Sequence, residues 1–377
     1  MGMVGGGGDA SIGATHQMAA GLDRKIEFVA GVFSSNPEKS RQVGENLGLS
    51  SSRVYDDYHA MATAEAKLPV GERIDFATIV TPNHLHFPVA KTFLEAGFNV
   101  VCDKPITLNL GEAVALGDLV KTIGKIFVLT YNYTGFPMVK EARKIVRDGE
   151  LGRILKVITE YPQGWVTNPL EAHGQDLGAW RNDPERAGAA GSLGDLGTHA
   201  EHLARYITGL EIEELCADFS TFGAGQRLED DANLLVHYKG GARGILHSSK
   251  ISAGDENHLN IRVYGSLASL EWNQEHPNEL IVKYPDAPRK TLRRGNPYVS
   301  ETGRRFTRLI RGQSEGYIEA FANIYLEAAR AIKAEVSGEK IPGDIDVPNV
   351  ADGIQGMSFL AAAVESAKRG GVWTRLA

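Results

Sequence analysis

The stretch NVVCDKPITLN, residues 99–109, begins as a short apolar strand and ends in an acid, a base and a proline. Similar apolar runs recur through the first third of the chain, with polar-faced helical segments between them. The runs are Met3-Val4, Ile26–Val32, Phe76–Val80, Asn99–Cys102 and Ile126–Thr130, and the helical segments are Ser11–Leu22, Pro37–Leu47, Phe87–Ala96 and Leu110–Ile123. Strands that alternate with helices predict βαβ units and a parallel sheet. Ligands bind such sheets at the carboxyl ends of the strands, and Lys104 follows one of these ends.

A second pattern replaces the first after about residue 150. Short runs joined by turns, several of them alternating apolar with polar residues, predict a largely antiparallel sheet with one covered face. The predicted strands are Ile154–Tyr161, Glu214–Phe222, Ala232–Tyr238, Arg243–Ser249, Leu259–Tyr264, Ala268–Trp272 and Glu279–Tyr284. Two helices follow, near Tyr317–Glu335 and Val350–Lys368, and the basic, polar residues 285–315 are expected to form a long loop or arm.

The expected fold is therefore α/β, with an N-terminal Rossmann fold and a C-terminal α+β domain built on an open, largely antiparallel sheet. We place the dinucleotide-binding domain at residues 1–130 and the substrate-binding and oligomerisation domain at 131–377. The C-terminal helix, about 350–369, is expected to pack back toward the first domain. An open sheet face of this size needs a cover, which predicts a homodimer or homotetramer formed through that face.

Composition narrows the class of protein. The length of 377 residues suits two domains. A net charge of −7 without a dense Lys/Arg block argues against nucleic acid or anionic membranes as partners. The two cysteines, Cys102 and Cys216, form no CxxC motif, so no structural zinc site is expected and a reducing, cytoplasmic location is the default. No secretory signal is visible, and the short first strand leaves open whether the N-terminus is complete.

A glycine-rich stretch, GGGGDASIGATH at residues 5–16, follows the first strand and opens a helix. In such a turn backbone amides approach a pyrophosphate, and the helix N-terminus adds partial positive charge. The spacing is irregular, with five residues between Gly7 and Gly13 where the usual pattern has two. By itself the stretch could be a flexible tail, but its place at the head of a βαβ series favours a cofactor site. The candidate residues are Gly5, Gly7, Gly8, Ser11, Ile12 and Gly13.

The ends of the second and third strands supply further cofactor candidates. Where NAD-binding sites usually place an acid for the ribose 2′-hydroxyl, this chain has Ser34 and Ser35, which leaves NAD and NADP both open. After the third strand come Thr81, Pro82 and Asn83, and then His84 and His86. Two histidines without a third ligand at a recognisable spacing indicate capping and packing rather than a metal site, so no metal is expected.

Several motifs together resemble one family. They are Thr81-Pro82-Asn83-x-x-His86, Ala96-Gly97-x-x-Val100-x-Cys102-Asp103-Lys104-Pro105, Trp180–Pro184 and Gly191–His199. This combination is similar to that of the glucose–fructose oxidoreductase / inositol dehydrogenase / MocA (Gfo/Idh/MocA) oxidoreductases, and most similar to the levoglucosan-dehydrogenase-like members. The chain departs from the family pattern in its longer glycine loop, in Asp103 where Glu is common, and in Ser34-Ser35 where many members have an acid.

The resemblance implies an oxidoreductase that uses NAD or NADP on a sugar, anhydrosugar or inositol-like polyol. It implies that Lys104 points into the site beside the nicotinamide ring and that Asp103 orients Lys104 or contacts the cofactor ribose. It also implies a cofactor or substrate contact near Asn132. For an isolated Asp-Lys pair, a solvated surface salt bridge would be the simpler interpretation.

Asp195 and His199 form a second candidate pair, spaced i, i+4, which one helix would place on one face about 6 Å apart. Oxidation of an alcohol requires a base for the hydroxyl proton, and histidine titrates in the right range. We therefore expect His199 as base, Asp195 as orienter and Lys104 as electrostatic clamp. Without the resemblance, a helix cap and a core histidine would explain the pair. Substrate contacts are expected from Tyr133, Trp165, Trp180 and Arg181, whereas Glu201 and His202 are expected on a helix surface.

Two other functions stay open at this point. One is a glycoside hydrolase that uses tightly held NAD for transient oxidation. The other is a non-catalytic, dinucleotide-binding sensor, which has no need of Lys104, Asp195 and His199 together.

Overall fold

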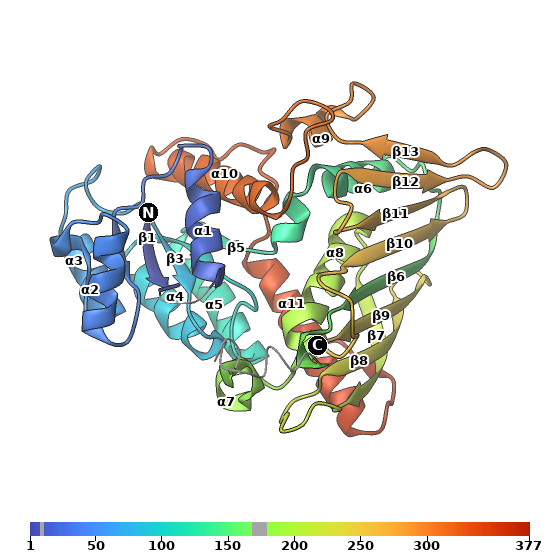
Figure 1. Cartoon of the computed structure of the whole chain (residues 1–377), viewed down its shortest axis with the longest axis horizontal. Helices are drawn as coiled ribbons and strands as arrows, with labels where there is room; N and C mark the ends of the chain where they lie inside the picture. The colour runs from blue at the N-terminus through green and yellow to red at the C-terminus, as the bar shows by residue number, and fades with distance from the viewer. Residues whose placement is uncertain (8–10, 168–178) are drawn as a thin grey trace. The chain divides into compact units, whose positions relative to one another are not determined.

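The computed structural model describes residues 1–7, 11–167 and 179–377, which form two compact units (Figure 1). The first unit comprises Met1–Tyr131 and Phe321–Ile354, and the second comprises Asn132–Ala320 and Gln355–Ala377. The helices α10 (Tyr317–Val336) and α11 (Val350–Lys368) supply residues to both units.

The first unit contains a five-stranded parallel sheet, as the alternation of strands and helices predicts. In spatial order its strands are β2 (Ala30–Val32), β1 (Gly2–Gly5), β3 (Phe76–Val80), β4 (Asn99–Cys102) and β5 (Phe127–Leu129). Every residue of β3 and β4 is buried, so side chains cover both faces of the sheet there. The connection from β2 to β3 crosses β1, which makes the carboxyl ends of β1 and β3 the topological switch point.

The helices of this unit begin and end where local chemistry predicts. They are α1 (Ser11–Gly21), α2 (Pro37–Asn46), α3 (Tyr58–Glu65), α4 (His86–Glu95) and α5 (Leu110–Ile123). Asn109 caps α5 by accepting from the backbone N–H of Glu112 at 3.0 Å, and Gly124 ends it with a φ of 75°. The predicted start of the second strand at Ile26 is wrong, because residues 26–29 are partly exposed and regular pairing begins at Ala30.

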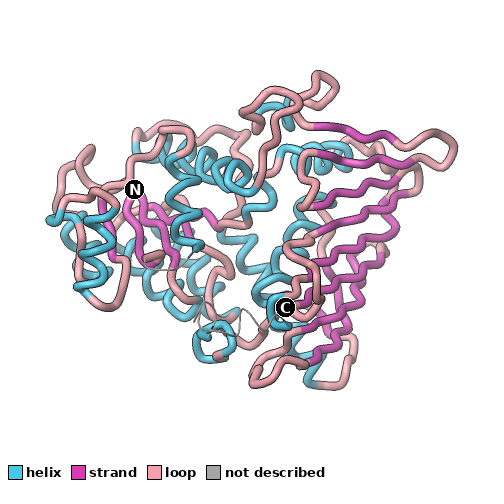
Figure 2. The backbone as a smooth tube through the Cα atoms, viewed as in Figure 1, coloured by secondary structure: helices cyan, strands magenta, loops and turns pink. Residues whose placement is uncertain are grey.

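The second unit contains a nine-stranded sheet, whose strands are magenta in Figure 2. It is antiparallel except for one neighbouring pair, β6 and β9. In spatial order the strands are β13 (Lys290–Arg293), β12 (Glu279–Lys283), β11 (Ser269–Asn273), β10 (Asn260–Gly265), β6 (Ile154–Pro162), β9 (Arg243–Ser249), β8 (Asp231–Tyr238), β7 (Ile212–Ser220) and β14 (Thr374–Arg375). All seven predicted strands are present. The expected open, largely antiparallel sheet is therefore confirmed.

Helices cover one face of this sheet. They include α6 (Pro137–Arg147), which packs on β11 and β12, and α8 (Thr198–Thr208), which packs on β6, β9 and β10 (Figure 1). Because α8 also packs against α6, Glu201 and His202 are buried, and their predicted surface position is wrong. Glu201 accepts a hydrogen bond from Arg205 Nε at 3.0 Å, which offsets the burial of its charge. The short helices α7 (Pro184–Ala187) and α9 (Glu301–Arg305) complete the unit.

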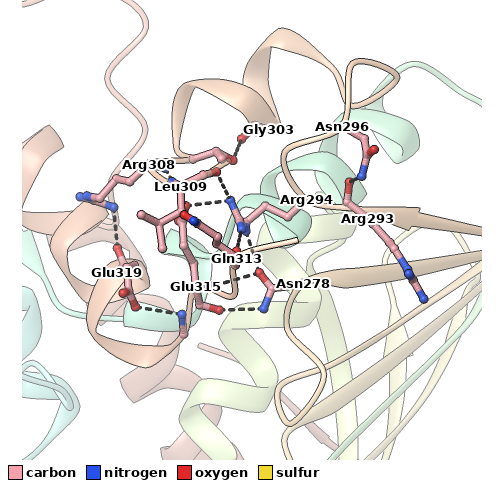
Figure 3. Close-up of polar contacts among 12 residues, drawn as sticks. Asn278, Arg293, Arg294, Asn296, Gly303, Arg308, Leu309, Gln313, Glu315 and Glu319 are labelled. Atoms are coloured by element: carbon pink, nitrogen blue, oxygen red, sulfur yellow. Dashed lines mark hydrogen bonds and ion pairs between the residues drawn. The ribbon is translucent and has the colours of Figure 1, made fainter. Parts of the chain in front are cut away.

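Residues 285–315 are more ordered than the predicted loop or arm. They contain β13 and α9, and Arg294 fastens the segment (Figure 3). The guanidinium of Arg294 donates to Asn278 Oδ1 at 2.7 Å, to Leu309 O at 2.8 Å and to Glu315 Oε1 at 2.8 Å. Arg294 and Glu315 are both buried, so this ion pair depends on its hydrogen bonds for compensation. Composition alone predicted a loop. The hydrogen bonds of Arg294 reach residues up to 21 positions away, so no local pattern indicates them.

Candidate active site

The turn between β1 and α1 has room only for glycine at several positions. A Cβ atom at Gly13 would overlap the backbone of Gly6, and one at Gly5 would overlap the carbonyl group of Val80 at the end of β3. Gly5 also has a φ of 86°, which favours glycine. At Gly7 a Cβ would meet the backbone of Phe33, which follows β2. Bare backbone therefore lines the switch point, as a pyrophosphate-binding turn requires.

The other glycine-loop candidates lie at or beside this turn. Ile12 and Gly13 are in the first turn of α1, which begins at Ser11. Gly8 lies outside the described residues, and so does the side chain of Ser11. The helix N-terminus thus follows the glycine turn directly, which favours an anion there.

Polar groups without carboxylates follow β2. Ser34 Oγ accepts from the backbone N–H of Asn36 at 3.1 Å, and Ser35 is exposed. Asn36 is used as the cap of α2, because its Oδ1 accepts from the backbone N–H of Glu38 at 2.9 Å. The two serines are therefore the groups of this turn that are placed to meet a ribose.

The turn after β3 contains a buried oxygen suited to a polar ligand. Thr81 Oγ1 is buried and has no hydrogen-bond partner among the described residues. Pro82 precedes a short 3₁₀ turn, Asn83–Leu85, in which Asn83 is buried. An unsatisfied buried hydroxyl is unfavourable unless a ligand or water completes it, so this turn also fits a bound dinucleotide.

His86 links this turn to the Asp-Lys-Pro turn. Its Nδ1 lies 2.6 Å from Pro105 O and its Nε2 lies 2.9 Å from Thr81 O. Burial lowers the pKa of His86, so the ring is neutral near pH 7 and donates one of these two hydrogen bonds. The structure thus gives His86 a bridging role between two turns, and its direct contact with a cofactor stays a prediction.

Asp103 fixes the backbone from which Lys104 projects. Its Oδ1 accepts from the backbone N–H of Lys104 at 2.9 Å and from Thr130 Oγ1 at 2.8 Å. Its Oδ2 lies 3.9 Å from His16 Nε2, and the other ring nitrogen of His16 lies 2.7 Å from Tyr325 OH. Burial alone would raise the pKa of Asp103, but the hydrogen bond and charge of His16, with Lys104 and Thr130, hold it well below its usual range. Of the two roles expected for Asp103, the geometry supports orientation of Lys104.

Aromatic rings surround His199 in the second unit. The ring of Tyr133 lies edge-on at a centroid distance of 4.7 Å, and that of Tyr161 lies at 6.2 Å. The two phenol groups are hydrogen-bonded to each other, and Tyr161 also donates to Asn257 Oδ1 at 2.5 Å. Burial raises the pKa of Tyr133 to about 12 and raises that of Tyr161 as well. Both phenols therefore stay protonated near neutral pH.

Asn132 precedes Tyr133 in the 3₁₀ turn Asn132–Gly135 and is buried. Its Nδ2 has no hydrogen-bond partner among the described residues. This donor is a second buried polar atom that a ligand would satisfy, in line with the contact expected at this position.

Asp195 lies in a π-helical turn, Leu193–Gly197, directly before α8. The wider turn replaces the α-helical i, i+4 geometry that the sequence predicted for Asp195 and His199. The buried carboxylate of Glu229 holds the start of this turn, accepting from the backbone N–H of Gly191 at 2.8 Å and of Leu193 at 2.9 Å. A helix does start near Asp195, as the i, i+4 spacing assumed, but its first turn is π-helical rather than α-helical.

Two cations flank the carboxylate of Asp195. Arg181 Nε lies 3.7 Å and Lys250 Nζ 3.4 Å from Asp195 Oδ2. Each cation also lies over an indole ring, Arg181 at 4.9 Å from Trp180 and Lys250 at 5.1 Å from Trp165. The structure thus brings together Asp195, Arg181 and the two tryptophans that were expected to contact a substrate.

Sequence reasoning missed Lys250, Glu229, His16 and Tyr325. His16 was part of the glycine-rich stretch, but nothing local indicated its contact with Tyr325, 309 residues away. Lys250 directly follows the predicted strand Arg243–Ser249, where an exposed lysine is usual. A signal for it would have been the alternation of that strand, which turns Ser248 and Lys250 to the same side.

The described ranges contain neither a metal-binding cluster nor a membrane-spanning helix. Residues 1–7, 11–167 and 179–377 contain no group of three or more His, Cys, Asp or Glu arranged to hold a metal ion. In the same ranges no helix is both long and apolar enough to cross a membrane.

Comparison with known proteins gives a consistent result for both units. Residues 1–133 match the oxidoreductase family with an NAD-binding Rossmann fold, and residues 139–271 match the GFO/IDH/MocA C-terminal domain. The uncharacterized oxidoreductase YfiI of Bacillus subtilis is 36% identical over 98% of this chain and 95% of its own length.

Two similar proteins have been studied with small molecules. The structure of an inositol dehydrogenase homologue from Azotobacter vinelandii, complexed with NAD+, has a TM-score of 0.95 and 36% identity, covering 99% of this chain and 96% of that one. Levoglucosan dehydrogenase of Pseudarthrobacter phenanthrenivorans is 26% identical over 90% of this chain and 87% of its length. The family predicted from the motifs is therefore confirmed, with identity higher to the inositol dehydrogenase homologue than to levoglucosan dehydrogenase. The chain belongs to the Gfo/Idh/MocA family of NAD-binding oxidoreductases.

Proposed function

We propose that this protein is an NAD(P)-dependent dehydrogenase that transfers hydride between nicotinamide and a secondary alcohol of a sugar, anhydrosugar or inositol-like polyol. The observation that carries the proposal is the cluster around Asp195, in which a partly exposed carboxylate lies beside two cations. Such a set of charged donors and acceptors suits a ligand rich in hydroxyl groups. Aromatic rings next to it suit the apolar faces of a pyranose or inositol ring.

The chemistry divides among three side chains. Lys104 binds the substrate oxygen and stabilises its developing negative charge. His199 takes the hydroxyl proton, because histidine is the side chain that most often serves as a general base. Asp195 accepts hydrogen bonds from substrate hydroxyls and orients them. The bound nicotinamide supplies or accepts the hydride.

The glycine turn, Thr81 and Asn132 would hold the dinucleotide, as their bare backbone and unsatisfied buried polar atoms suggest. No carboxylate stands at residues 33–36 to repel a 2′-phosphate, so NADP is acceptable on physical grounds. The structures of the inositol dehydrogenase homologue contain NAD+ or NADH, which favours NAD as the first cofactor to test.

The test is reduction of NAD and of NADP by the purified protein over a panel of substrates. Inositols and anhydrosugars head the panel, because similar structures were solved with myo-inositol and with levoglucosan. We expect turnover on a member of this panel, and a loss of about 10²–10³-fold in kcat for Lys104→Met. Lys91→Met is the matched control, since Lys91 forms an exposed pair with Glu95. Turnover that survives Lys104→Met unchanged would overturn the assignment.

The same assay separates the alternative functions. A hydrolase that uses NAD transiently would release reducing sugar from a glycoside without net formation of NADH. A sensor would bind the dinucleotide and turn over nothing. The clustering of Asp195, Arg181 and Lys250 favours the dehydrogenase or the hydrolase over the sensor.

We also propose that two copies of the chain associate through the sheet face opposite α6 and α8. In the part of the second unit that the structure describes, no helix covers that face (Figure 1). Leu235 and Ile245 pair across β8 and β9 with 51% and 37% of their surface exposed, and Ile158 of β6 pairs with Ile245 in the same row. An apolar row of this kind suits a self-complementary interface.

Light scattering coupled to size-exclusion chromatography tests the association. The wild-type protein is expected to elute as a dimer or tetramer, and Leu235→Arg is expected to shift it toward the monomer. Val70→Arg, at an exposed position of the first unit, is the control and leaves the mass unchanged. A strictly monomeric wild-type protein would contradict the proposal.

A further inference from the structure

Lys250 is a buried lysine that the proposed reaction does not yet use. It directly follows β9, and only 5% of its surface is exposed. Lysine is almost never buried to this degree without a partner, because removal of its charge from water is unfavourable. The residues around Lys250 must therefore compensate the burial of its charge.

The surroundings of Lys250 hold it in one place. Its backbone N–H donates to Asp230 O at 2.7 Å, and its carbonyl accepts from the N–H of Val166 at 3.0 Å. Its Nζ lies 5.1 Å from the ring centre of Trp165. Trp165 is fixed in turn, since its Nε1 donates to Gln163 Oε1 at 3.0 Å.

The charged partner of Lys250 is Asp195. The Nζ–Oδ2 distance of 3.4 Å lies within reach of a charge-assisted hydrogen bond, while Asp195 keeps 24% of its side chain exposed. The two groups come from different elements, the end of β9 and the π-helical turn before α8. Their contact therefore fixes the carboxylate relative to the sheet rather than relative to its own turn.

We propose that Lys250 is a positioning residue, whose ammonium group holds the Asp195 carboxylate in the orientation from which it acts on the substrate. The inference rests on the proposed function, because it assigns Lys250 a role through Asp195. Arg181, the other cation on this carboxylate, lies on the more exposed side at 3.7 Å. Lys250 is thus the more buried of the two cations that contact Asp195.

The surrounding charges predict how Lys250 titrates. Burial lowers the pKa of Lys250, Asp195 raises it, Arg181 lowers it and Glu229 raises it, and the net direction is downward. Loss of the ammonium charge should therefore begin below the usual pH range of lysine. The positioning of Asp195 is expected to fail as that charge is lost.

Kinetics provide the first test, with Lys250→Met, Lys250→Arg and the surface control Lys239→Met, whose ion pair with Glu211 is exposed. We expect Lys250→Met to lower kcat by about 10- to 100-fold with a smaller change in KM, because a misplaced orienting group acts mainly on the reacting complex. The wild-type pH profile should show an alkaline decline that Lys250→Met lacks, and Lys250→Arg should restore part of the activity. Wild-type kinetics and an unchanged pH profile in folded Lys250→Met would overturn the inference.

A second measurement does not depend on activity, and so separates this inference from the proposed function. Protein labelled with ¹³C at lysine Cε gives a resonance for Lys250 that is identified by its absence in Lys250→Arg. Its titration is expected below the usual lysine pKa, and lower still in Asp195→Asn. If Asp195→Asn leaves this titration unchanged, Lys250 and Asp195 are not coupled and the inference fails. If the coupling is present but the wild-type protein turns over no substrate, the proposed function fails instead.

Discussion

Two aspartates, Asp103 in the first unit and Asp195 in the second, lie among cations in different ways. Asp103 accepts two short hydrogen bonds on Oδ1, from its own loop and from Thr130. Asp195 instead has two longer ion pairs, of 3.4 and 3.7 Å, from side chains of other elements. The Asp103 carboxylate thus binds a backbone N–H and a hydroxyl, whereas the Asp195 carboxylate lies between two cationic side chains.

The difference indicates how each carboxylate serves a site. Short hydrogen bonds to a backbone N–H and a hydroxyl occupy Oδ1 and fix a loop, while Oδ2 faces the His16 ring. Longer ion pairs neutralise a charge while the carboxylate keeps its capacity for hydrogen bonds. We therefore expect substitutions at Asp103 to act mainly on stability and substitutions at Asp195 mainly on turnover.

The largest effect is expected for Asp195→Asn. Asparagine keeps the shape but removes the charge that Lys250 and Arg181 hold, so kcat should fall by about 10²-fold. The midpoint of urea unfolding should fall less than for Asp103→Asn, because Asp195 is partly exposed and the unpaired Lys250 can lose its proton. Steady-state kinetics and urea titration check the two parts. A large loss of stability with unchanged kcat would contradict the expectation that Asp195 acts mainly on turnover.

Asp103→Asn should show the opposite balance. The amide cannot reproduce both the charge and the two hydrogen bonds on Oδ1, so the free energy of unfolding should fall by about 1–3 kcal/mol. The loss in kcat should be smaller than for Asp195→Asn, since Lys104 itself remains. Urea titrations of both variants side by side decide this, and equal stability losses would contradict it.

The pH dependence of the free energy of unfolding at acid pH tests Asp103 directly. Its pKa in the folded protein lies below the ordinary value of 3.8, so the unfolded chain takes up the proton first as the pH falls. The wild-type protein should therefore lose up to about 1 kcal/mol per pH unit from this group below pH 4, and Asp103→Asn should lack this contribution. Chemical unfolding at pH values between 3 and 6 measures it. Parallel curves for the two proteins would show that Asp103 is not stabilised as a carboxylate.

A smaller effect is expected at Tyr325, which contacts the His16 ring that lies beside Asp103. Tyr325→Phe removes the hydroxyl that lies 2.7 Å from His16 Nδ1, which should lower the free energy of unfolding by about 1 kcal/mol. A double-mutant cycle with His16→Phe should give a coupling of about 0.5–1 kcal/mol. Additive losses would mean that the two residues contribute independently.

The sequence predicted the fold well because its signals are local. Five parallel strands, seven antiparallel-sheet strands and the helix that starts at Leu110 follow from periodicity and capping, which act over a few residues. The Asp-Lys-Pro turn and the Asp195 region were recognised from motifs. The start of β2, the order within residues 285–315 and the π-helical turn were not predicted. For residues 285–315 the reason is that Arg294 depends on partners distant in the sequence.

The missed site residues have the same cause. Lys250 and Asp195 are 55 positions apart, and His16 and Tyr325 are 309 apart. Alternation along β9 could indicate which side Lys250 faces, but neither contact leaves a local pattern that identifies the partner. Buried charges of this kind become visible only when the sheet brings their elements together.

The order of the second sheet has a consequence for its solubility. The strands at its two edges are β13 and β14, and unpaired strand edges invite further strands to add. β13 exposes Lys290 and Arg293, while β14 consists only of Thr374 and Arg375. Short, basic edges resist the addition of another chain. Growth of this sheet into fibrils is thereby disfavoured, which leaves its broad face as the surface that we propose for contacts between copies.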